Sequence, residues 1–173
     1  MASVPGVANA LVCAVVPGEG RAQLESYLRD REVSFELIEH AHSESAAAEA
    51  RAAHLPAEQT AKTVVLHTPD SYRFAVIPAS DRLDLNKAAA ALDVSRHQLR
   101  LASEEDLASD FAGYEVGALP PVGPDAPAEL IDTRLLAFGR VLCSAGDHEH
   151  SLLVDPTDIV RLTGARTVDI RQD

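Results

Sequence analysis

Ala61-Lys62-Thr63-Val64-Val65-Leu66 is an apolar run typical of a buried strand, yet it carries a lysine. The chain has 15 basic residues, and Lys62 and Lys87 are its only lysines. Burial of a lone ammonium is costly, so this side chain is expected to face solvent, a partner charge or a ligand. The alternative is a strand-end lysine whose ammonium reaches water along its aliphatic stem.

Helices and strands are expected on both sides of this run. Strands are predicted at residues 34–39, 63–67, 72–77, 139–143 and 151–154. Helices are predicted at residues 21–31, at 43–53 with Ser43 as N-cap, at 85–92 after Asp84, in a short segment opened by the capping box Ser103–Asp106 with Leu107 and Phe111 facing inward, and from Asp155-Pro156 to Gly164. Because the order lacks a regular β-α-β alternation, the sequence favours a single α+β domain with a mixed sheet and flanking helices. It has no Gly-x-Gly-x-x-Gly or Walker loop.

Composition excludes some classes of protein. A length of 173 residues with 46% hydrophobic content fits one globular domain, and 4% aromatic content predicts a core of Leu, Val, Ile and Ala. A net charge of −12 argues against a general nucleic-acid binder, because such binders neutralise phosphates with Lys and Arg. One nucleic-acid end in a locally basic pocket stays compatible with this charge, and solubility alone is the simpler explanation for the acidity.

Two cysteines and the N-terminal segment bear on the compartment. Cys13 and Cys143 are far apart in apolar runs, which predicts two reduced thiols in a cytoplasmic protein. The apolar run 10–16 lacks a basic flank and is too short to span a bilayer, so no membrane association is expected. Residues 1–19 are interpreted as a tail or an added strand, and residues 20–173 as the folded domain.

Three groups of residues could carry chemistry. The Gly/Pro loop Gly113–Gly123 is either a plain loop or a rigid backbone that presents N–H groups to an oxyanion. His148 and His150 repeat the His-x-His spacing of His40 and His42, but a polar turn is a simpler explanation than a metal site, and no metal or other cofactor is predicted. No serine or cysteine stands in a recognisable nucleophile motif.

The order of several motifs is more specific than any one of them. Along the chain these are Ala61–Leu66, Arg82-Leu-Asp-Leu-Asn-Lys87, Gly113-Tyr-x-Val-Gly-x-x-x-Pro-x-Gly123, Ile131-Asp132 and Ser144-Ala-Gly146. This order resembles the YbaK family, the free-standing relatives of the prolyl-tRNA synthetase insertion (editing) domain. The resemblance runs from about Arg21 to the C-terminus.

The resemblance implies an aminoacyl-tRNA deacylase that acts in trans, with the fold of the editing domain. The expected substrate is Cys or Ala on proline tRNA, and the expected partners are the aminoacylated 3′ end and a prolyl-tRNA synthetase. Lys62 matches the essential lysine of the family, Gly117 opens the Gly-x-x-x-Pro loop, and Asp132 matches an aspartate that follows this loop. The resemblance implies substrate-binding positions at Ala118, Leu119, Pro120, Pro121, Ser144, Gly146 and His148. For Asp132, a strand-end turn is as good an interpretation as a role beside Lys62 or a ribose hydroxyl.

The chain departs from the family pattern in two places. Relatives often write Gly-Gly-x-Ser-Pro where this chain has Gly117-Ala118-Leu119-Pro120-Pro121, and the segment after Ser144 also differs. These departures leave the amino-acid preference open. They also keep two other functions in view, namely a binding module that recognises an amino acid, a nucleotide or a charged tRNA end, and a domain that contacts proteins through residues 10–16.

Overall fold

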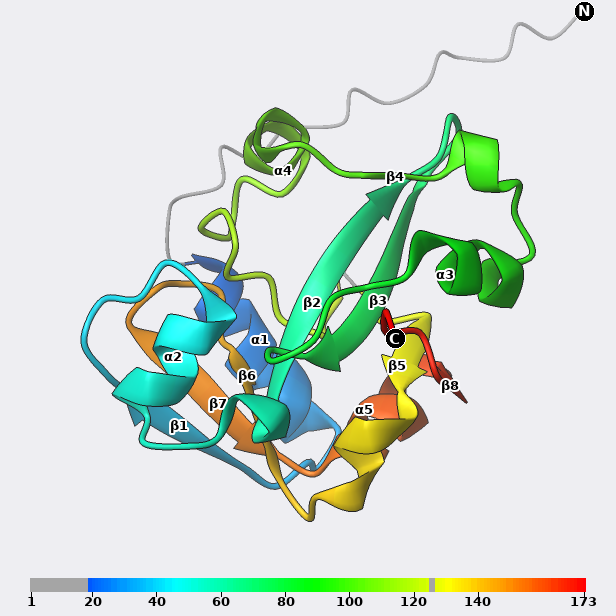
Figure 1. Cartoon of the computed structure of the whole chain (residues 1–173). Coiled ribbons are helices and arrows are strands. Elements are labelled where there is room, and N and C mark those ends of the chain that lie inside the picture. The colour runs from blue at the N-terminus through cyan, green and yellow to red at the C-terminus, as the bar shows by residue number, and fades with distance from the viewer. Residues whose placement is uncertain (1–18, 125–126) are drawn as a thin grey trace, which may run out of the picture.

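The computed structural model describes residues 19–124 and 127–173 (Figure 1). The strands are β1 (Phe35–Glu39), β2 (Thr60–His67), β3 (Tyr72–Pro78), β4 (Arg100–Leu101), β5 (Leu130–Asp132), β6 (Val141–Ser144), β7 (His150–Val154) and β8 (Arg166–Val168). The α-helices are α1 (Glu19–Asp30), α2 (Ala46–Ala52), α3 (Leu85–Leu92), α4 (Glu104–Asp110) and α5 (Pro156–Thr163). Three 3₁₀ turns are η1 (Ala57–Gln59), η2 (Arg96–Gln98) and η3 (Thr133–Ala137). The predictions for residues 1–18, including Cys13 and the run 10–16, lie outside the described residues.

The strands form one mixed sheet in the order β1-β7-β6-β2-β3-β5-β8, and β4 pairs with β2 off this path. Pairing is antiparallel in the β2–β3 hairpin, between β6 and β7 and between β1 and β7. It is parallel where β6 meets β2 and where β5 lies between β3 and β8. This confirms the prediction of a single α+β domain with a mixed sheet.

Alternation along the central hairpin divides the core between the two faces of the sheet. On β3, Val76 belongs to one cluster of buried side chains, whereas Ala75 and Ile77 belong to another that includes residues of α3. The first and largest cluster includes side chains from α1 and α5, which lie behind the sheet in the view of Figure 1. A third, smaller cluster joins Val65 and Phe74 to the end of α4 and the Gly/Pro loop.

Capping residues that were recognised in the sequence do begin and end two of the helices. The α5 helix begins after the N-cap Asp155 with Pro156 in its first turn, and ends at Gly164 with φ +71°. The capping box of Ser103 and Asp106 opens α4, and Leu107 and Phe111 pack inward. One cap was wrong: Ser45 caps α2, because its hydroxyl accepts the Ala48 N–H, whereas Ser43 binds the carbonyl of His148.

Candidate active site

The candidate site begins at an interruption in the pairing of β2. On one edge of β2, β6 pairs with Thr60 and Ala61, and β4 pairs with Leu66 and His67. The Val65 carbonyl on this edge accepts the Ala102 N–H at 2.9 Å. Because backbone groups alternate between the two edges of a strand, those of Thr63 face the same interruption as those of Val65.

A cavity of about 350 Å³ occupies this interruption. Its floor is residues 62–65 of β2, and it is closed by the start of α2, by α4 and β4, and by the Gly/Pro loop. The lining residues include Lys62, Thr63, Ser144, Gly117, Leu119 and Leu107. Four of the predicted site residues, Lys62, Gly117, Leu119 and Ser144, therefore meet at one cavity, although they come from three separate parts of the chain.

Thr63 was missed by the sequence analysis. Its hydroxyl is buried and has no hydrogen-bond partner among the described residues. An unpaired buried hydroxyl costs free energy, so this oxygen at the cavity is available to a polar group of a ligand. A threonine in a strand is ordinary, and the sequence holds no signal that would have singled it out.

Lys62 lies between this cavity and a second one. Its Nζ donates to the Asp81 carbonyl at 3.0 Å. Burial lowers the pKa of Lys62, and this effect outweighs the opposing charge of Asp81. The second cavity, of about 470 Å³, is also lined by Arg82 and Arg96, so three cations border one connected depression.

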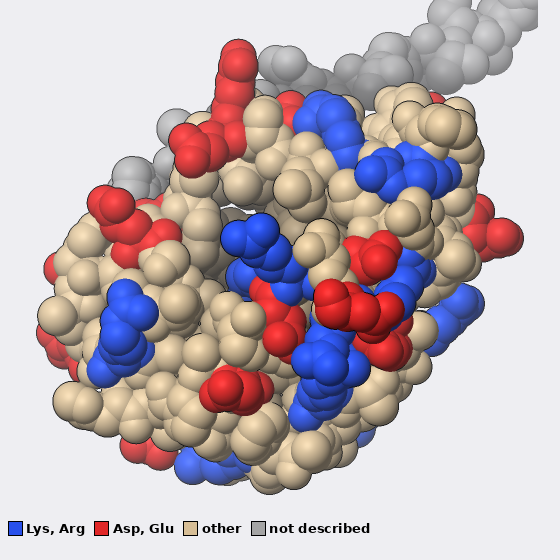
Figure 2. Space-filling model, in the orientation of Figure 1, with Lys and Arg blue, Asp and Glu red and all other residues tan. Residues whose placement is uncertain are grey.

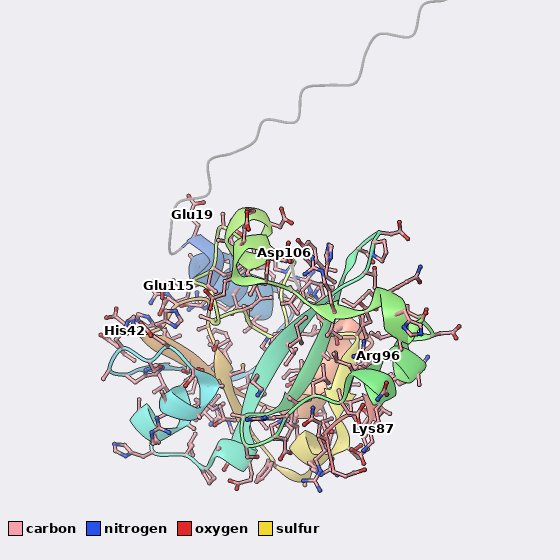
Figure 3. All side chains as sticks on the ribbon, turned by 45° about the horizontal axis from the view of Figure 1, so that its top comes forward. Glu19, His42, Lys87, Arg96, Asp106 and Glu115 are labelled. Atoms are coloured by element: carbon pink, nitrogen blue, oxygen red, sulfur yellow. The ribbon has the colours of Figure 1, made fainter. Side chains whose placement is uncertain are left out.

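Two views show this setting. Basic side chains border a hollow on the face seen in Figure 2, and acidic side chains lie next to them. Figure 3 places Arg96 on one side of the β2–β3 hairpin and Glu115 and His42 on the other. Val64 and Leu101 line both cavities, and Leu101 is 54% exposed. The part shared by the two cavities therefore combines the ammonium of Lys62 with two apolar side chains.

The Gly/Pro loop forms a tight bend at Gly117. The Ala118 N–H donates to the Glu115 carbonyl at 2.9 Å, which closes a four-residue turn. Gly117, at the third position of this turn, has φ +87°, the conformation that a type II turn requires and that glycine adopts without strain. The Gly117 N–H has no partner within residues 19–124 and 127–173, whereas the Ala118 N–H is engaged. The bend thus leaves the main-chain N–H unpaired at a residue that lines the cavity.

The β6–β7 loop holds the bend in place. The Glu115 N–H donates to the Gly146 carbonyl at 2.9 Å, and the Glu115 carboxylate accepts the His148 N–H at 2.7 Å. Gly146 has φ +107°, and a Cβ there would lie 3.1 Å from the Tyr114 ring. Gly146 and His148 stand behind the bend and are not among the residues that line the cavity.

Three other residues predicted to bind substrate are also set back from the cavity. Ala118, Pro120 and Pro121 are buried beneath the bend and are not among its lining residues. The Pro121 carbonyl accepts the Ala128 N–H at 3.2 Å, which ties the end of the bend to the segment before β5. These residues fix the shape of the bend.

Asp132 is placed elsewhere. Its carboxylate is fully buried at the end of β5 and accepts hydrogen bonds from the Arg134 N–H, the Arg134 guanidinium and the Ile170 N–H. It lines neither cavity, and Lys62 donates to Asp81 instead. These contacts favour the strand-end interpretation of Asp132, in which it joins η3 to the C-terminal segment.

Glu49 is a buried residue that the sequence analysis missed. It lies on α2, is 5% exposed, and accepts hydrogen bonds from the hydroxyls of Ser144, at 2.8 Å, and Ser151. Ser151 is 2.7 Å from the Nε2 atom of His40. Burial raises the pKa of Glu49, although both hydroxyls oppose this. Its only signal in the sequence is an acidic residue within an alanine-rich helix.

Other predictions concern metals, thiols and membranes. No group of three or more metal-binding side chains converges within the described residues. His148 instead approaches the Glu115 carboxylate at 3.7 Å, and His150 binds Asp147 at 2.8 Å. Cys143 is a free, buried thiol whose pKa is raised by burial. Among the described helices, none has the length and apolar character needed to span a bilayer.

The fold and this cavity define an α+β domain with a lysine and a glycine bend at an interrupted sheet edge. Residues 40–162 match the aminoacyl-tRNA editing domain, and the chain belongs to this family.

Solved structures share the fold. A candidate trans-editing enzyme for prolyl tRNA synthetase is 25% identical with a TM-score of 0.76, and the match covers 92% of this chain and 100% of that one. The hypothetical protein APE2540 is 24% identical with a TM-score of 0.76, over 86% of this chain and 98% of that one. A third match, 19% identical with a TM-score of 0.63, is to a candidate signal transduction protein from Marinobacter aquaeolei VT8, and it covers 86% of this chain and 30% of that one.

Proposed function

We propose that this protein is an aminoacyl-tRNA deacylase that hydrolyses the ester of a mischarged tRNA in trans. The observation that carries the proposal is the meeting of Lys62 and the Gly117 bend at one cavity of about 350 Å³. Family membership supports the same activity, since the family is that of the aminoacyl-tRNA editing domain. Cytoplasmic location follows from the proposed substrate.

The two groups suit ester hydrolysis. The ammonium of Lys62 would attract the ester carbonyl or the terminal ribose phosphate. The free N–H of Gly117 would stabilise the oxyanion that forms when the carbonyl carbon is attacked, an effect of roughly 3–4 kcal/mol for one good donor. An aminoacyl ester is already reactive, so this stabilisation is sufficient without a protein nucleophile. The attacking group would be water, or a hydroxyl or thiol of the substrate.

The size and lining of the cavity bear on which amino acid is removed. Leu107, Leu119 and Val65 make its inner wall apolar, and the hydroxyls of Thr63 and Ser144 lie beside them. Such a wall suits a small side chain with little or no polar character. We therefore propose Ala or Cys on proline tRNA as the substrate, with prolyl-tRNA synthetase as the source of the mischarged tRNA. The similarity to a candidate trans-editing enzyme for prolyl tRNA synthetase supports this choice.

The test is a deacylation assay on proline tRNA charged with Cys, Ala, Ser or Pro. We expect turnover of the Ala or Cys ester and at least a tenfold lower rate for Lys62→Ala at unchanged folding. Lys87→Ala is the matched control, because Lys87 pairs with Asp173 and does not line the cavity. Saturable binding without turnover would make the protein a binding module, and equal rates for both variants would remove Lys62 from the mechanism.

The affinity for tRNA should fall with rising salt, by an amount that corresponds to only a few phosphate contacts. Lys62, Arg82 and Arg96 border the depression, and the net charge of −12 repels the rest of the RNA. Neutralisation of about three phosphates of a single strand predicts roughly a 20-fold loss of affinity between 50 and 200 mM salt. Affinity that does not change with salt would contradict a phosphate-anchored mode.

A further inference from the structure

Glu49 has surroundings that are unusual for a residue with only a structural role. Its carboxylate is buried, yet the hydrogen bonds given to it come from two neutral hydroxyls, those of Ser144 and Ser151. No lysine or arginine donates to it within the described residues. A buried carboxylate without a cation is costly, and an uncharged glutamine could accept a hydrogen bond from one of these hydroxyls and donate one to the other.

The position of Glu49 relates this cost to the cavity. Ser144 lines the cavity together with Lys62 and Gly117, and the Ser144 hydroxyl donates to Glu49 at 2.8 Å. The Ser144 oxygen keeps lone pairs with which it can accept a hydrogen bond from a molecule in the cavity. Ionisable groups that are buried at a cost beside a reaction cavity are common at functional sites.

We propose that Glu49 is a positioning residue that acts through Ser144 on the water that attacks the ester. Glu49 holds the Ser144 hydroxyl so that its oxygen accepts a proton from this water. The inference rests on the proposed deacylase function and adds to it the base that Lys62 and Gly117 do not supply.

In this reaction, one proton moves from the attacking water to Glu49 and then to the leaving ribose oxygen. The water oxygen forms a bond to the ester carbonyl carbon, and the carbonyl electrons move to the oxyanion beside the Gly117 N–H. The water proton passes to Ser144 as the Ser144 proton passes to Glu49. When the oxyanion collapses, the bond from carbon to the ribose oxygen breaks, and the same proton returns through Ser144 to that oxygen. The products are the free amino acid and the tRNA 3′ hydroxyl.

Several titratable groups face Glu49 and affect its ionisation. His40, which directly follows β1, and His148, in the β6–β7 loop, interact electrostatically with Glu49, and so does Cys143 on β6. Both histidines favour the ionised carboxylate when they are protonated. Burial acts in the opposite direction and dominates, so the pKa of Glu49 is raised above its ordinary value of 4.5.

The test compares Glu49→Gln with wild type in the deacylation of Ala-charged proline tRNA from pH 5 to 8. We expect kcat to fall about 100-fold, as for the loss of a general base, with KM within twofold of wild type. The wild-type rate should decline toward acid pH as Glu49 takes up a proton, and this decline should disappear in Glu49→Gln. Glu105→Gln, at an exposed glutamate of α4, is the matched control and should behave as wild type.

The stability of Glu49→Gln distinguishes a positioning role of Glu49 from a structural one. Because burial disfavours the charged form, Glu49→Gln should be at least as stable as wild type at pH 7. Ser144→Ala should lower kcat to the same level, and the double variant should be no slower than either single variant, because both residues act in one step.

Four results would overturn the proposal. Wild-type kcat in Glu49→Gln, or a loss of kcat with an unchanged acid limb and a lower melting temperature, would make Glu49 structural. An acyl-serine trapped by acid quench would make Ser144 the nucleophile. A wild-type protein that hydrolyses none of the charged tRNAs would overturn the deacylase function together with this inference, whereas the other three results leave that function intact.

Discussion

Replacement of Gly117 by alanine tests the central geometric feature of the site. Gly117 has φ +87°, a conformation that costs an L-residue about 1–2 kcal/mol. The added Cβ would lie 3.6 Å from the Glu44 carbonyl oxygen and 3.9 Å from Cε1 of His148, which are ordinary contacts. The cost is therefore one of backbone conformation alone. In a domain of this size it lowers the melting temperature by about 2–8 °C.

Gly164 offers a matched control. It has φ +71° at the end of α5, and a Cβ there would meet nothing within 4 Å. Gly164→Ala should therefore cost the same 1–2 kcal/mol as Gly117→Ala, at a position away from the cavity. Urea denaturation of both variants measures this cost, and it should appear as equal shifts of the midpoint with an unchanged slope.

Activity should then separate the two variants. In Gly117→Ala, the strained bend moves the free N–H of residue 117, and we expect deacylation to fall at least tenfold per folded molecule. Gly164→Ala should stay within twofold of wild type. Equal activities at equal stabilities would show that the bend does not contribute to the reaction, and a Gly117→Ala protein as stable as wild type would show that the bend does not have this conformation.

Three further predictions concern single side chains. Asp132→Asn should lower the free energy of unfolding by about 2–3 kcal/mol in urea denaturation, because a fully buried carboxylate that accepts four hydrogen bonds is replaced by a weaker acceptor, while activity per folded molecule stays unchanged. A loss of activity at full stability would show that Asp132 takes part in the mechanism. Lys62→Met should be more stable than wild type at pH 7, because burial lowers the pKa of Lys62 below 10.5 and its charged form is disfavoured in the folded state at every pH below that lowered pKa. The stability difference between Lys62→Met and wild type should therefore shrink as the pH rises through that pKa toward 10.5. Urea denaturation at pH 7 and 10 measures this difference, and a difference that grows with pH would contradict the prediction. In a Cys13→Ser background, Cys143 should resist iodoacetamide at pH 8 until urea unfolds the protein, since the thiol is buried and its pKa is raised; rapid labelling of the folded protein would contradict this.

Local signals in the sequence were enough to place the main helices and the longer strands. Asp155, Pro156 and Gly164 act within one or two turns of the chain, so the bounds of α5 follow from the residues themselves. Strands of two or three residues, such as β4, β5 and β8, have no periodicity to detect. They exist because β2, β3 and β5 offer edges to pair with, and this is decided by the tertiary fold.

Some residues of the candidate site could likewise be found from the sequence, and others only from the tertiary structure. Lys62 breaks a local pattern, as a lysine in an apolar run, and could be found from the sequence. Gly117 breaks none within the Gly/Pro loop, and it was found only because the order of motifs resembles the family. Glu49 breaks no pattern, because an acidic residue on a short alanine-rich helix is ordinary. Its partners Ser144 and Ser151 follow about a hundred residues later, and only the pairing of β6 with β7 brings them beneath α2.

The interruption in the pairing of β2 explains why these residues meet. If β6 or β4 extended along β2, residues 62–65 would be paired with a strand and no cavity could form there. The bend at Gly117 borders the cavity at this interruption, and the Pro120-Pro121 pair that follows is unsuited to strand pairing, because proline has no N–H to donate. Gly117 with its free N–H, Thr63 with its unpaired hydroxyl and Lys62 with its ammonium consequently line one cavity at this edge of the sheet.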